Sequence, residues 1–362
     1  MATLPHGAAA VACATALVLG LAGCGQGTEP GGADDGGSVH IGLLLPDNLG
    51  RWEDFDRPLI EQAVAERCGD CTVEVANAEG DAATQQRQVD SMITGGVDSL
   101  IISPIDAIAI RASVERAHEA GIHVVAYDRL AEGPVSAYAS FDNNQVGRLQ
   151  ATALVEALAD VERPRIVMLN GSPTDPNAEE FAQGAREVFD GRVEVNREYD
   201  ILDWSRDEAY ATMSGAIVRF GAERIDGVYA GNDSIASGAI AALKHAQVSP
   251  LPPVTGQDAE LAAIQLIVTG EQEMTVYKPF RLEAEPAAEM ALALARGDPL
   301  DSVATDSVGN ATVEHIPAVL ATPTPVTVDT IESTVVRDGM FTIDQICTPR
   351  IAPACRRAGL TG

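Results

Sequence analysis

Side chains of opposite charge follow a short apolar run in the first half of the chain. Two such runs occur in the stretch VVAYDRLAEGPVSAYASFDNNQVG, and each ends in polar residues. The first ends in Asp128 and Arg129, and the second ends in Asp142 and Asn143. Carboxylates accept hydrogen bonds, whereas guanidinium and amide groups donate them. If both runs are strands that end at one crevice, these groups form a hydrogen-bonding surface; otherwise they are solvated turns.

Similar side chains follow the other strand-like runs of the chain. In open α/β sheets, ligands bind beyond the carboxyl ends of the strands. The polar and aromatic residues in such positions are Arg51, Trp52, Asp106, Asp128, Arg129, Asp142, Asn143, Asp175, Asn177, Asp203, Trp204, Asn232, Asp233, Gln257, Asp258 and Lys278. Because they occur in both halves of the chain, they favour one crevice as the candidate site.

The elements that must position these residues follow an alternating pattern. From residue 39 onward, β-rich runs alternate with segments of helical period, which predicts an α/β fold of parallel sheets with helices on both faces. The expected strands include residues 39–45, 72–77, 99–103, 123–127, 165–170 and 227–231. The pattern restarts after the SFDNN motif, so one module is used twice. No GxxxxGK[ST] occurs and no GxGxxG follows a strand, which argues against a nucleotide cofactor.

The residue types favour a neutral ligand with several hydroxyl groups. A hydroxyl can donate to a carboxylate and accept from a guanidinium group, and such charge-assisted bonds are strong. The chain has two tryptophans, Trp52 and Trp204, one in each half, and they could cover the apolar faces of a sugar. Each could instead be a packing residue. The histidines lack metal-ligand spacing, so we expect neither a metal nor a cofactor.

The composition and the N-terminus indicate an exported protein. The formal net charge of -29 disfavours nucleic acid and anionic membrane surfaces as partners. An apolar run of signal-peptide length leads into LAGC, which resembles a bacterial lipobox, although the preceding MATLPHG has no Lys or Arg. We expect a signal peptide at 1–23, a lipidated Cys24, and a flexible tether at 24–38. The lipid would anchor the chain on the outer face of the cytoplasmic membrane; a buried helix or a plain cleaved signal are the alternatives.

Four cysteines remain after the leader, in two close pairs. In an exported protein this spacing predicts two local disulfides, Cys68–Cys71 and Cys347–Cys355. A redox CxxC or a four-thiolate zinc site is the alternative. Both are disfavoured, because CGDC does not lie at a strand-to-helix turn and the second pair has poor zinc spacing.

Several motifs resemble those of the periplasmic D-xylose-binding proteins of bacterial ABC transporters. The most specific are RW, AYDR, SFDN, GSPTDPNA, GNDSIASGAI, GQDA and MTVYKP, within a similarity over residues 39–340. The resemblance implies a type I periplasmic-binding-protein fold, with two doubly wound parallel-sheet lobes, three hinge crossings and a sugar between the lobes. The implied parts are lobe 1 (39–142 plus 279–308), lobe 2 (143–278 plus 309–340) and a C-terminal extension (341–362).

The resemblance also implies the residues that contact the sugar. They are Arg51, Trp52, Asp128, Arg129, Asn143, Asn177, Trp204, Asn232, Asp258 and Lys278. Asn143 would lie at the first hinge crossing, while Asp233 would cap the helix that begins near Ser234. Pro176 and the segment ILDWSRD depart from the family pattern.

These observations favour a binding receptor over two other functions. The receptor would be a monomer that captures a monosaccharide, D-xylose first among them, by hinge closure and delivers it to the permease subunits of an ABC transporter. An exported glycoside hydrolase is disfavoured, because GxSxG and HExxH are absent and most strand-end carboxylates adjoin Arg or amides. A sensor that passes a sugar signal to a membrane receptor or kinase is the alternative, whereas a repressor would need a basic helix-turn-helix.

Overall fold

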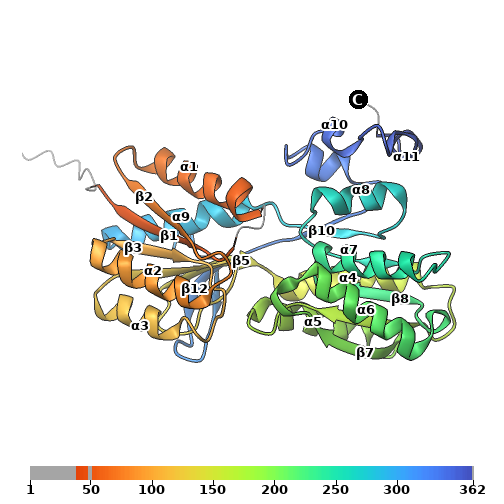
Figure 1. Cartoon of the computed structure of the whole chain (residues 1–362). Coiled ribbons are helices and arrows are strands. Elements are labelled where there is room, and N and C mark those ends of the chain that lie inside the picture. Colours follow the sequence, from red (N-terminus) through yellow and green to blue (C-terminus); the bar gives the residue numbers. More distant parts are fainter. Residues whose placement is uncertain (1–37, 48–50, 361–362) are drawn as a thin grey trace, which may run out of the picture. The chain divides into compact units, whose positions relative to one another are not determined.

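Two parallel sheets organise the chain (Figure 1). The computed structural model describes residues 38–47 and 51–360. The predicted signal peptide, the lipidation site Cys24 and all of the tether except Ser38 lie outside these residues. Residues 37–362 make up one compact unit. Among the described residues, no helix has the length and apolar character needed to cross a membrane.

The first sheet has seven strands in the order β11-β12-β5-β4-β3-β1-β2. They are β1 (His40–Leu45), β2 (Thr72–Asn77), β3 (Ser99–Ile102), β4 (His123–Tyr127), β5 (Ala137–Phe141), β11 (Asp306–Val308) and β12 (Ile316–Ala321). Neighbours are parallel except β11 and β12. The expected strands at 39–45, 72–77, 99–103 and 123–127 thus match four of these to within a residue at each end.

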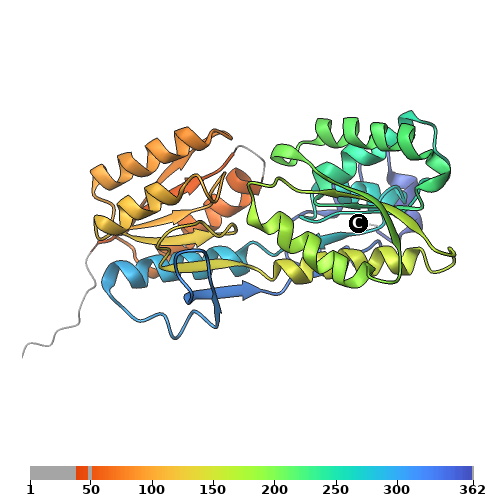
Figure 2. The same cartoon turned by 90° about the horizontal axis from the view of Figure 1, so that it is seen from below.

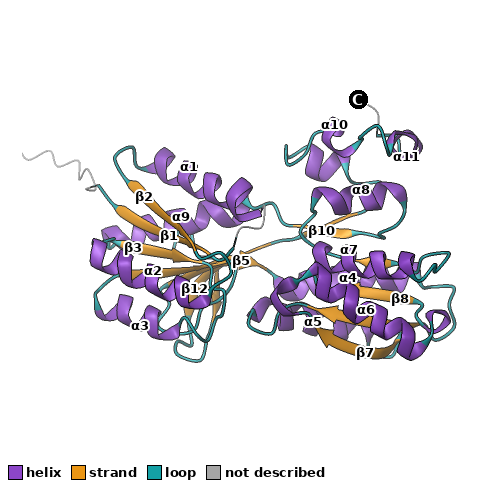
Figure 3. Ribbon diagram, viewed as in Figure 1, coloured by secondary structure: helices purple, strands orange, loops and turns teal. Residues whose placement is uncertain are grey.

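Helices cover both faces of this sheet (Figure 3). They are the π-helical turn η1 (Trp52–Asp56), α1 (Arg57–Arg67), α2 (Ala82–Gly95), α3 (Arg111–Glu119) and α9 (Arg281–Arg296). Successive residues of a strand face opposite sides. Accordingly, Leu43 packs in a core with α1 and α9, whereas Leu44 packs in a core with α2 and α3.

The second sheet repeats this construction with four parallel strands in the order β7-β6-β8-β9. They are β6 (Arg165–Asn170), β7 (Glu194–Asp200), β8 (Gly227–Ala230) and β9 (Val254–Thr255). The surrounding helices are α4 (Asn143–Ala157), α5 (Pro176–Phe189), α6 (Arg206–Phe220), α7 (Asp233–His245) and α8 (Leu261–Thr269), with short turns η2 (Leu202–Trp204) and η3 (Ala222–Arg224). Val167 packs in the core beneath α6 and α7, and Met168 packs in the core with α4 and α5.

The last part of the chain adds a small antiparallel pair and a helical segment. The pair joins β10 (Thr275–Tyr277) to β13 (Thr324–Val326). The turn η4 (Glu332–Val336) and helices α10 (Ile343–Ile346) and α11 (Ala352–Arg357) follow it. Ile346 and Cys355 share an apolar core with Ile264 of α8, so this segment is packed against the second half of the chain.

Within the described residues, the chain passes between the two sheets at three points. These lie between β5 and α4, between β10 and α9, and between β12 and β13. We expected residues 309–340 to return to the second half, but β12 pairs with β5 in the first sheet, as Figure 2 shows for this blue segment. The expectation is wrong for β12, because Ile316 and Ala318 are buried in the first sheet's core. The third crossing therefore follows Ala321.

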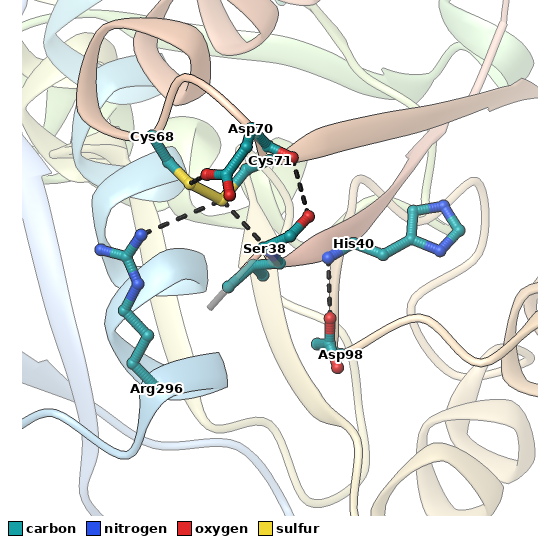
Figure 4. The surroundings of a disulfide bond; sticks show 8 residues. Ser38, His40, Cys68, Asp70, Cys71, Asp98 and Arg296 are labelled. Atoms are coloured by element: carbon teal, nitrogen blue, oxygen red, sulfur yellow. Dashed lines mark hydrogen bonds between the residues drawn. A yellow bond between two sulfur atoms is a disulfide. The ribbon is translucent and has the colours of Figure 1, made fainter. Parts of the chain in front are cut away.

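The cysteines pair as the spacing predicted. Cys68 is bonded to Cys71, and Cys347 is bonded to Cys355. The first pair, shown in Figure 4, lies at the amino ends of β1 and β2. The Val39 N–H donates to the Cys71 sulfur at 3.2 Å. The two pairs belong to different apolar cores, so the four thiolates do not form the zinc site considered as an alternative.

Candidate functional site

A cavity of about 670 Å³ lies where carboxyl ends of strands from both sheets come together. Asp128 directly follows β4, Asn232 follows β8, and Lys278 directly follows β10. The residues implied by the resemblance that line this cavity are Arg51, Trp52, Asp128, Arg129, Asn177, Trp204, Asn232, Asp258 and Lys278. The strand-end rule therefore brings together residues that are far apart in the sequence.

Arg51 is the centre of a buried ion cluster on one side of the cavity. Its guanidinium group lies 2.9 Å from Asp128, 3.1 Å from Asp56 and 2.9 Å from Glu283. The Tyr127 hydroxyl donates a hydrogen bond to Asp56. Asp56 and Glu283 are fully buried, and together with Asp128 they hold the guanidinium group in place. Arg51 can therefore present its remaining N–H surface to a ligand without moving.

Asp128 and Arg129 are not a solvated surface pair. They are 4% and 8% exposed, and their side chains are 4.0 Å apart. The nearer partner of Arg129 is Asp175, at 2.7 Å. The Asp128 backbone has a φ of 61°, in the left-handed region, and its carbonyl accepts hydrogen bonds from Tyr138, Ser140 and Asn177. These bonds hold the turn and aim the Asp128 carboxylate at Arg51.

The two indoles share the cavity but differ in exposed surface. Trp52 is only 2% exposed, and the guanidinium group of Arg51 lies over its ring at 4.4 Å. Trp204 is half-buried, and its indole N–H donates to Asp175 at 3.2 Å. Trp204 also contacts the edge of Phe181, with ring centroids 6.3 Å apart. Trp204 thus offers the larger free aromatic surface, while Trp52 supports Arg51.

Gly171 provides the space that the Trp204 ring occupies. A Cβ at residue 171 would lie 2.0 Å from the Cη2 atom of Trp204. Gly171→Ala is therefore expected to displace the indole and to destabilise the protein by about 1–3 kcal/mol. A shift of tryptophan fluorescence and a lower Tm would show this. The control is Gly215→Ala in α6, where nothing lies within 4 Å, so the spectrum should stay unchanged and the Tm should not fall. An unshifted spectrum in Gly171→Ala would contradict the prediction.

On the second-sheet side, the amide and carboxylate roles differ from those expected. Asn232 is the residue that caps α7, since its side chain accepts from the Ile235 N–H, although it also lines the cavity. Asp233 was expected to cap this helix, but it is buried and accepts from Gln272 and Thr275 instead. The cap falls on Asn232 because its backbone is extended, whereas Asp233 is the first helical residue.

Lys278 forms an ion pair with Asp258 at the same rim. The Nζ atom lies 2.8 Å from the Asp258 carboxylate, and Lys278 is 2% exposed. The ammonium group also lies 5.7 Å from the ring centre of Phe181. Lys278 is therefore not an ordinary solvated lysine. It brings a cation from the second crossing to the cavity wall.

Asn143 is the one residue of the implied set that does not line this cavity. It is the first residue of α4, and its amide donates to Glu180 of α5 at 2.8 Å. The neighbouring Asp142 caps α4 by accepting from the Gln145 N–H. Both side chains are engaged in holding helices, so the structure does not bring Asn143 to the site as the sequence predicted.

Comparison with known proteins identifies the family. A profile described as a periplasmic binding protein domain matches residues 41–299. The D-xylose-binding periplasmic protein of Escherichia coli strain K12 is 37% identical over 308 residues, which is 83% of this chain and 90% of that protein. The chain belongs to the periplasmic binding protein family. Two further relatives support the same assignment.

One of these relatives is compared by its sequence and the other by its solved structure. The multiple sugar-binding periplasmic receptor ChvE of Rhizobium radiobacter is 32% identical over 88% of this chain and 94% of its own length. A solute-binding protein of an ABC transporter from Clostridium phytofermentans, solved with bound β-D-glucose, has 28% identity and a TM-score of 0.78. That comparison covers 85% of this chain and 99% of the other. This periplasmic binding protein is accordingly a solute-binding protein and not an enzyme, and its family implies an extracytoplasmic location.

The electrostatics of the site keep Arg51 and Asp128 charged. Burial disfavours the charged form of Arg51, but Asp128, Asp56 and Glu283 raise its pKa well above its usual range. Burial would raise the pKa of Asp128, yet Arg51, Lys278 and Arg129 hold it below its ordinary value. Asp128 is therefore an ionised acceptor beside Arg51, which is a charged donor. This arrangement suits recognition of a hydroxyl group better than proton transfer.

Sequence reasoning missed several parts of the site. Asp175 was recognised only as a residue after a strand, yet it holds both Arg129 and the Trp204 N–H. A signal was present in the sequence, because Asp175 directly precedes Pro176. A proline is common at the first position of a helix, so Asp175 could have been predicted as the N-cap of α5. Phe280 and Phe341 also line the cavity, and their apolar type gave no functional signal.

Proposed function

We propose that this periplasmic binding protein captures a monosaccharide, D-xylose, and delivers it to the permease subunits of an ABC transporter. The observation that carries the proposal is the convergence of carboxylate and amide acceptors, cations and one free indole face in a single cavity. The D-xylose-binding relatives from Escherichia coli and Haemophilus influenzae, at 37% and 36% identity, support xylose as the sugar.

Two buried acceptors of the cavity wall support a ligand that donates hydrogen bonds. Within the described residues, the side-chain oxygens of Asn177 and Gln257 are buried and have no hydrogen-bond partner. A buried acceptor without a partner costs free energy, so such atoms call for a donor. The hydroxyl groups of a sugar supply donors, and they also accept from Arg51, Arg129 and Lys278.

The mechanism follows from the two sources of these side chains. Arg51, Asp128 and Arg129 belong to the elements around the first sheet, whereas Asn177 and Asp258 belong to those around the second. A ligand that binds both sets stabilises the form in which they are close together, by its differential affinity for that form. The closed form would be recognised by the permease, and the sugar leaves chemically unchanged.

We further propose that the protein is a lipid-anchored monomer. Cys24 would carry the lipid that tethers the protein to the outer face of the membrane. Mass spectrometry of the protein from the membrane fraction tests the lipid at Cys24. A neutral ligand is compatible with a net charge of -29, since it is not repelled by that charge.

Calorimetric titration of residues 37–362 with D-xylose, D-glucose, D-ribose and myo-inositol tests the ligand. We expect D-xylose to bind most tightly. If another sugar binds more tightly, that sugar takes the place of D-xylose as the proposed ligand. If none of the four sugars gives heat, the proposed function is refuted.

Lys278→Met is expected to weaken binding of the same sugar about 10- to 100-fold, because a hydrogen bond from a charged group is worth about 1.5–3 kcal/mol. The control is Lys244→Met. Lys244 also forms an ion pair, with Glu271 at 2.9 Å, but it is half exposed and does not line the cavity. The affinity of Lys244→Met for the sugar should match that of the unaltered protein. If Lys278→Met binds the sugar as tightly as Lys244→Met does, Lys278 does not contact the ligand.

A further inference from the structure

The segment that follows η4 reaches the ligand cavity. Met340, Phe341 and Gln345 are among the residues that line it, and we refer to these three as the C-terminal wall. They lie beyond residues 41–299, which match the family profile. None of these three residues was expected to contact the ligand.

The C-terminal wall is held by bonds on both of its sides. Thr342 and Gln345 form a capping box at the start of α10. The Gln265 amide of α8 donates to the Gln345 carbonyl at 3.1 Å. Beneath these contacts, Ile346 is fully buried in the core that also contains Ile264. The wall is therefore a fixed surface joined to α8.

A disulfide closes the segment directly behind the wall. Cys347 follows α10 and is bonded to Cys355 in α11. Cys355 is 2% exposed and lies in the same core as Phe341. Loss of this bond would free the short chain between α10 and α11, and the wall would lose its support from that side.

Aromatic contacts connect the C-terminal wall with the ion cluster. Phe341 meets Phe55 edge to face, with centroids 6.4 Å apart, and Phe55 meets Phe280 at 5.7 Å. The guanidinium group of Arg51 lies 4.6 Å from the centre of the Phe280 ring. The polar part of the cavity thus continues into an apolar part that ends at Phe341.

We propose that the C-terminal wall determines specificity, with Phe341 as its main residue and the Cys347–Cys355 bond as its support. This inference rests on the proposed function. Met340 and Phe341 are the apolar part of this wall and cannot pair with a hydroxyl, and burying an unpaired hydroxyl is costly. The wall therefore favours a sugar that turns a carbon without a hydroxyl toward it. A pentopyranose has a ring methylene where a hexopyranose has a hydroxymethyl group, so the wall selects pentoses.

The first test compares D-xylose and D-glucose in Phe341→Ser. Removing the ring is expected to weaken xylose roughly tenfold and to leave glucose less affected, so that the ratio of the two dissociation constants moves toward one. Phe341→Leu, which restores an apolar side chain, should recover most of the xylose preference. The Tm of the ligand-free variants shows that they fold, since a role in folding alone would not alter the ratio.

The second test removes the disulfide by Cys347→Ser with Cys355→Ser. Xylose affinity is expected to fall several-fold, in the same direction as in Phe341→Ser. The control is Cys68→Ser with Cys71→Ser, because that bond lies at the amino ends of β1 and β2 (Figure 4) and neither cysteine lines the cavity. Its removal should leave xylose affinity unchanged.

The outcomes separate this inference from the proposed function. If the unaltered protein binds xylose and the ratio is the same in Phe341→Ser, the C-terminal wall is not a specificity element and the proposed function stands. If both disulfide variants lose affinity equally, the special role of Cys347–Cys355 is refuted. If the unaltered protein binds no sugar, the proposed function falls.

Discussion

Replacing Arg51 with methionine is expected to lower the free energy of unfolding by about 3–5 kcal/mol at neutral pH. The guanidinium group pairs with Asp56, Asp128 and Glu283, and methionine would leave these carboxylates buried without it. Chemical denaturation of the ligand-free protein measures the loss. Sugar binding should be lost as well, because Arg51 lines the cavity.

The loss of stability in Arg51→Met should depend on pH. Burial raises the pKa of Asp56 and of Glu283 even with Arg51 present. A carboxyl group with a raised pKa binds its proton more tightly in the folded state, so its protonation stabilises the folded protein as the pH falls through that pKa. Arg51 lowers both pKa values, so they should be higher still in Arg51→Met. The difference in stability between Arg51→Met and the unaltered protein should therefore shrink as the pH falls from neutral toward the ordinary carboxyl range.

Arg57→Met is the matched control for Arg51→Met. Arg57 also pairs with two carboxylates, Glu53 and Glu61, but its side chain is 43% exposed. Exposed pairs contribute about 0–1 kcal/mol, so this change should cost little and show little dependence on pH. Similar losses in both variants would refute the role of Arg51 as the centre of the buried cluster.

Trp204→Ala is expected to remove measurable binding of xylose, with a loss of roughly 2–4 kcal/mol, as for other aromatic residues at the centre of a binding site. The indole is the larger free aromatic face in the cavity, and its N–H holds Asp175, which in turn holds Arg129. Titration calorimetry measures the loss.

Phe220→Ala serves as the control for lost packing in Trp204→Ala. Both side chains pack against the core of the second sheet, but Phe220 does not line the cavity. Phe220→Ala should lower the Tm and leave the xylose-binding isotherm unchanged. If Trp204→Ala also leaves that isotherm unchanged, Trp204 does not contact the sugar.

Much of the fold could be predicted because it rests on local periodicity. The alternation of strands with helices fixes the direction of each parallel strand, and this direction places Asp128 and Asn232 at the carboxyl ends of strands in the first and second sheets. The resemblance to known motifs then indicated which of the residues near the strand ends face the cavity. The strand pattern and the resemblance together predict that Arg51, Arg129 and Asn177 line it, as they do.

The parts that could not be predicted depend on lateral contacts. The pairing of β12 with β5 joins residues that are far apart in the sequence, and a local pattern does not predict such a pairing. Asn143 lies at a strand end like the others, but Glu180 of a neighbouring helix takes its amide. Phe341 reaches the cavity through contacts with Phe55, far away in the sequence.

The backbone of Asp128 restricts how this site can change in evolution. A left-handed φ of 61° is tolerated by Asn and Gly but strained for most other side chains. A mutation to Glu or Ala, each a single codon step away, would distort the turn as well as alter the chemistry. A change of sugar preference therefore meets less backbone strain at the other positions of the cavity wall than at position 128, where only Asn and Gly fit the turn readily.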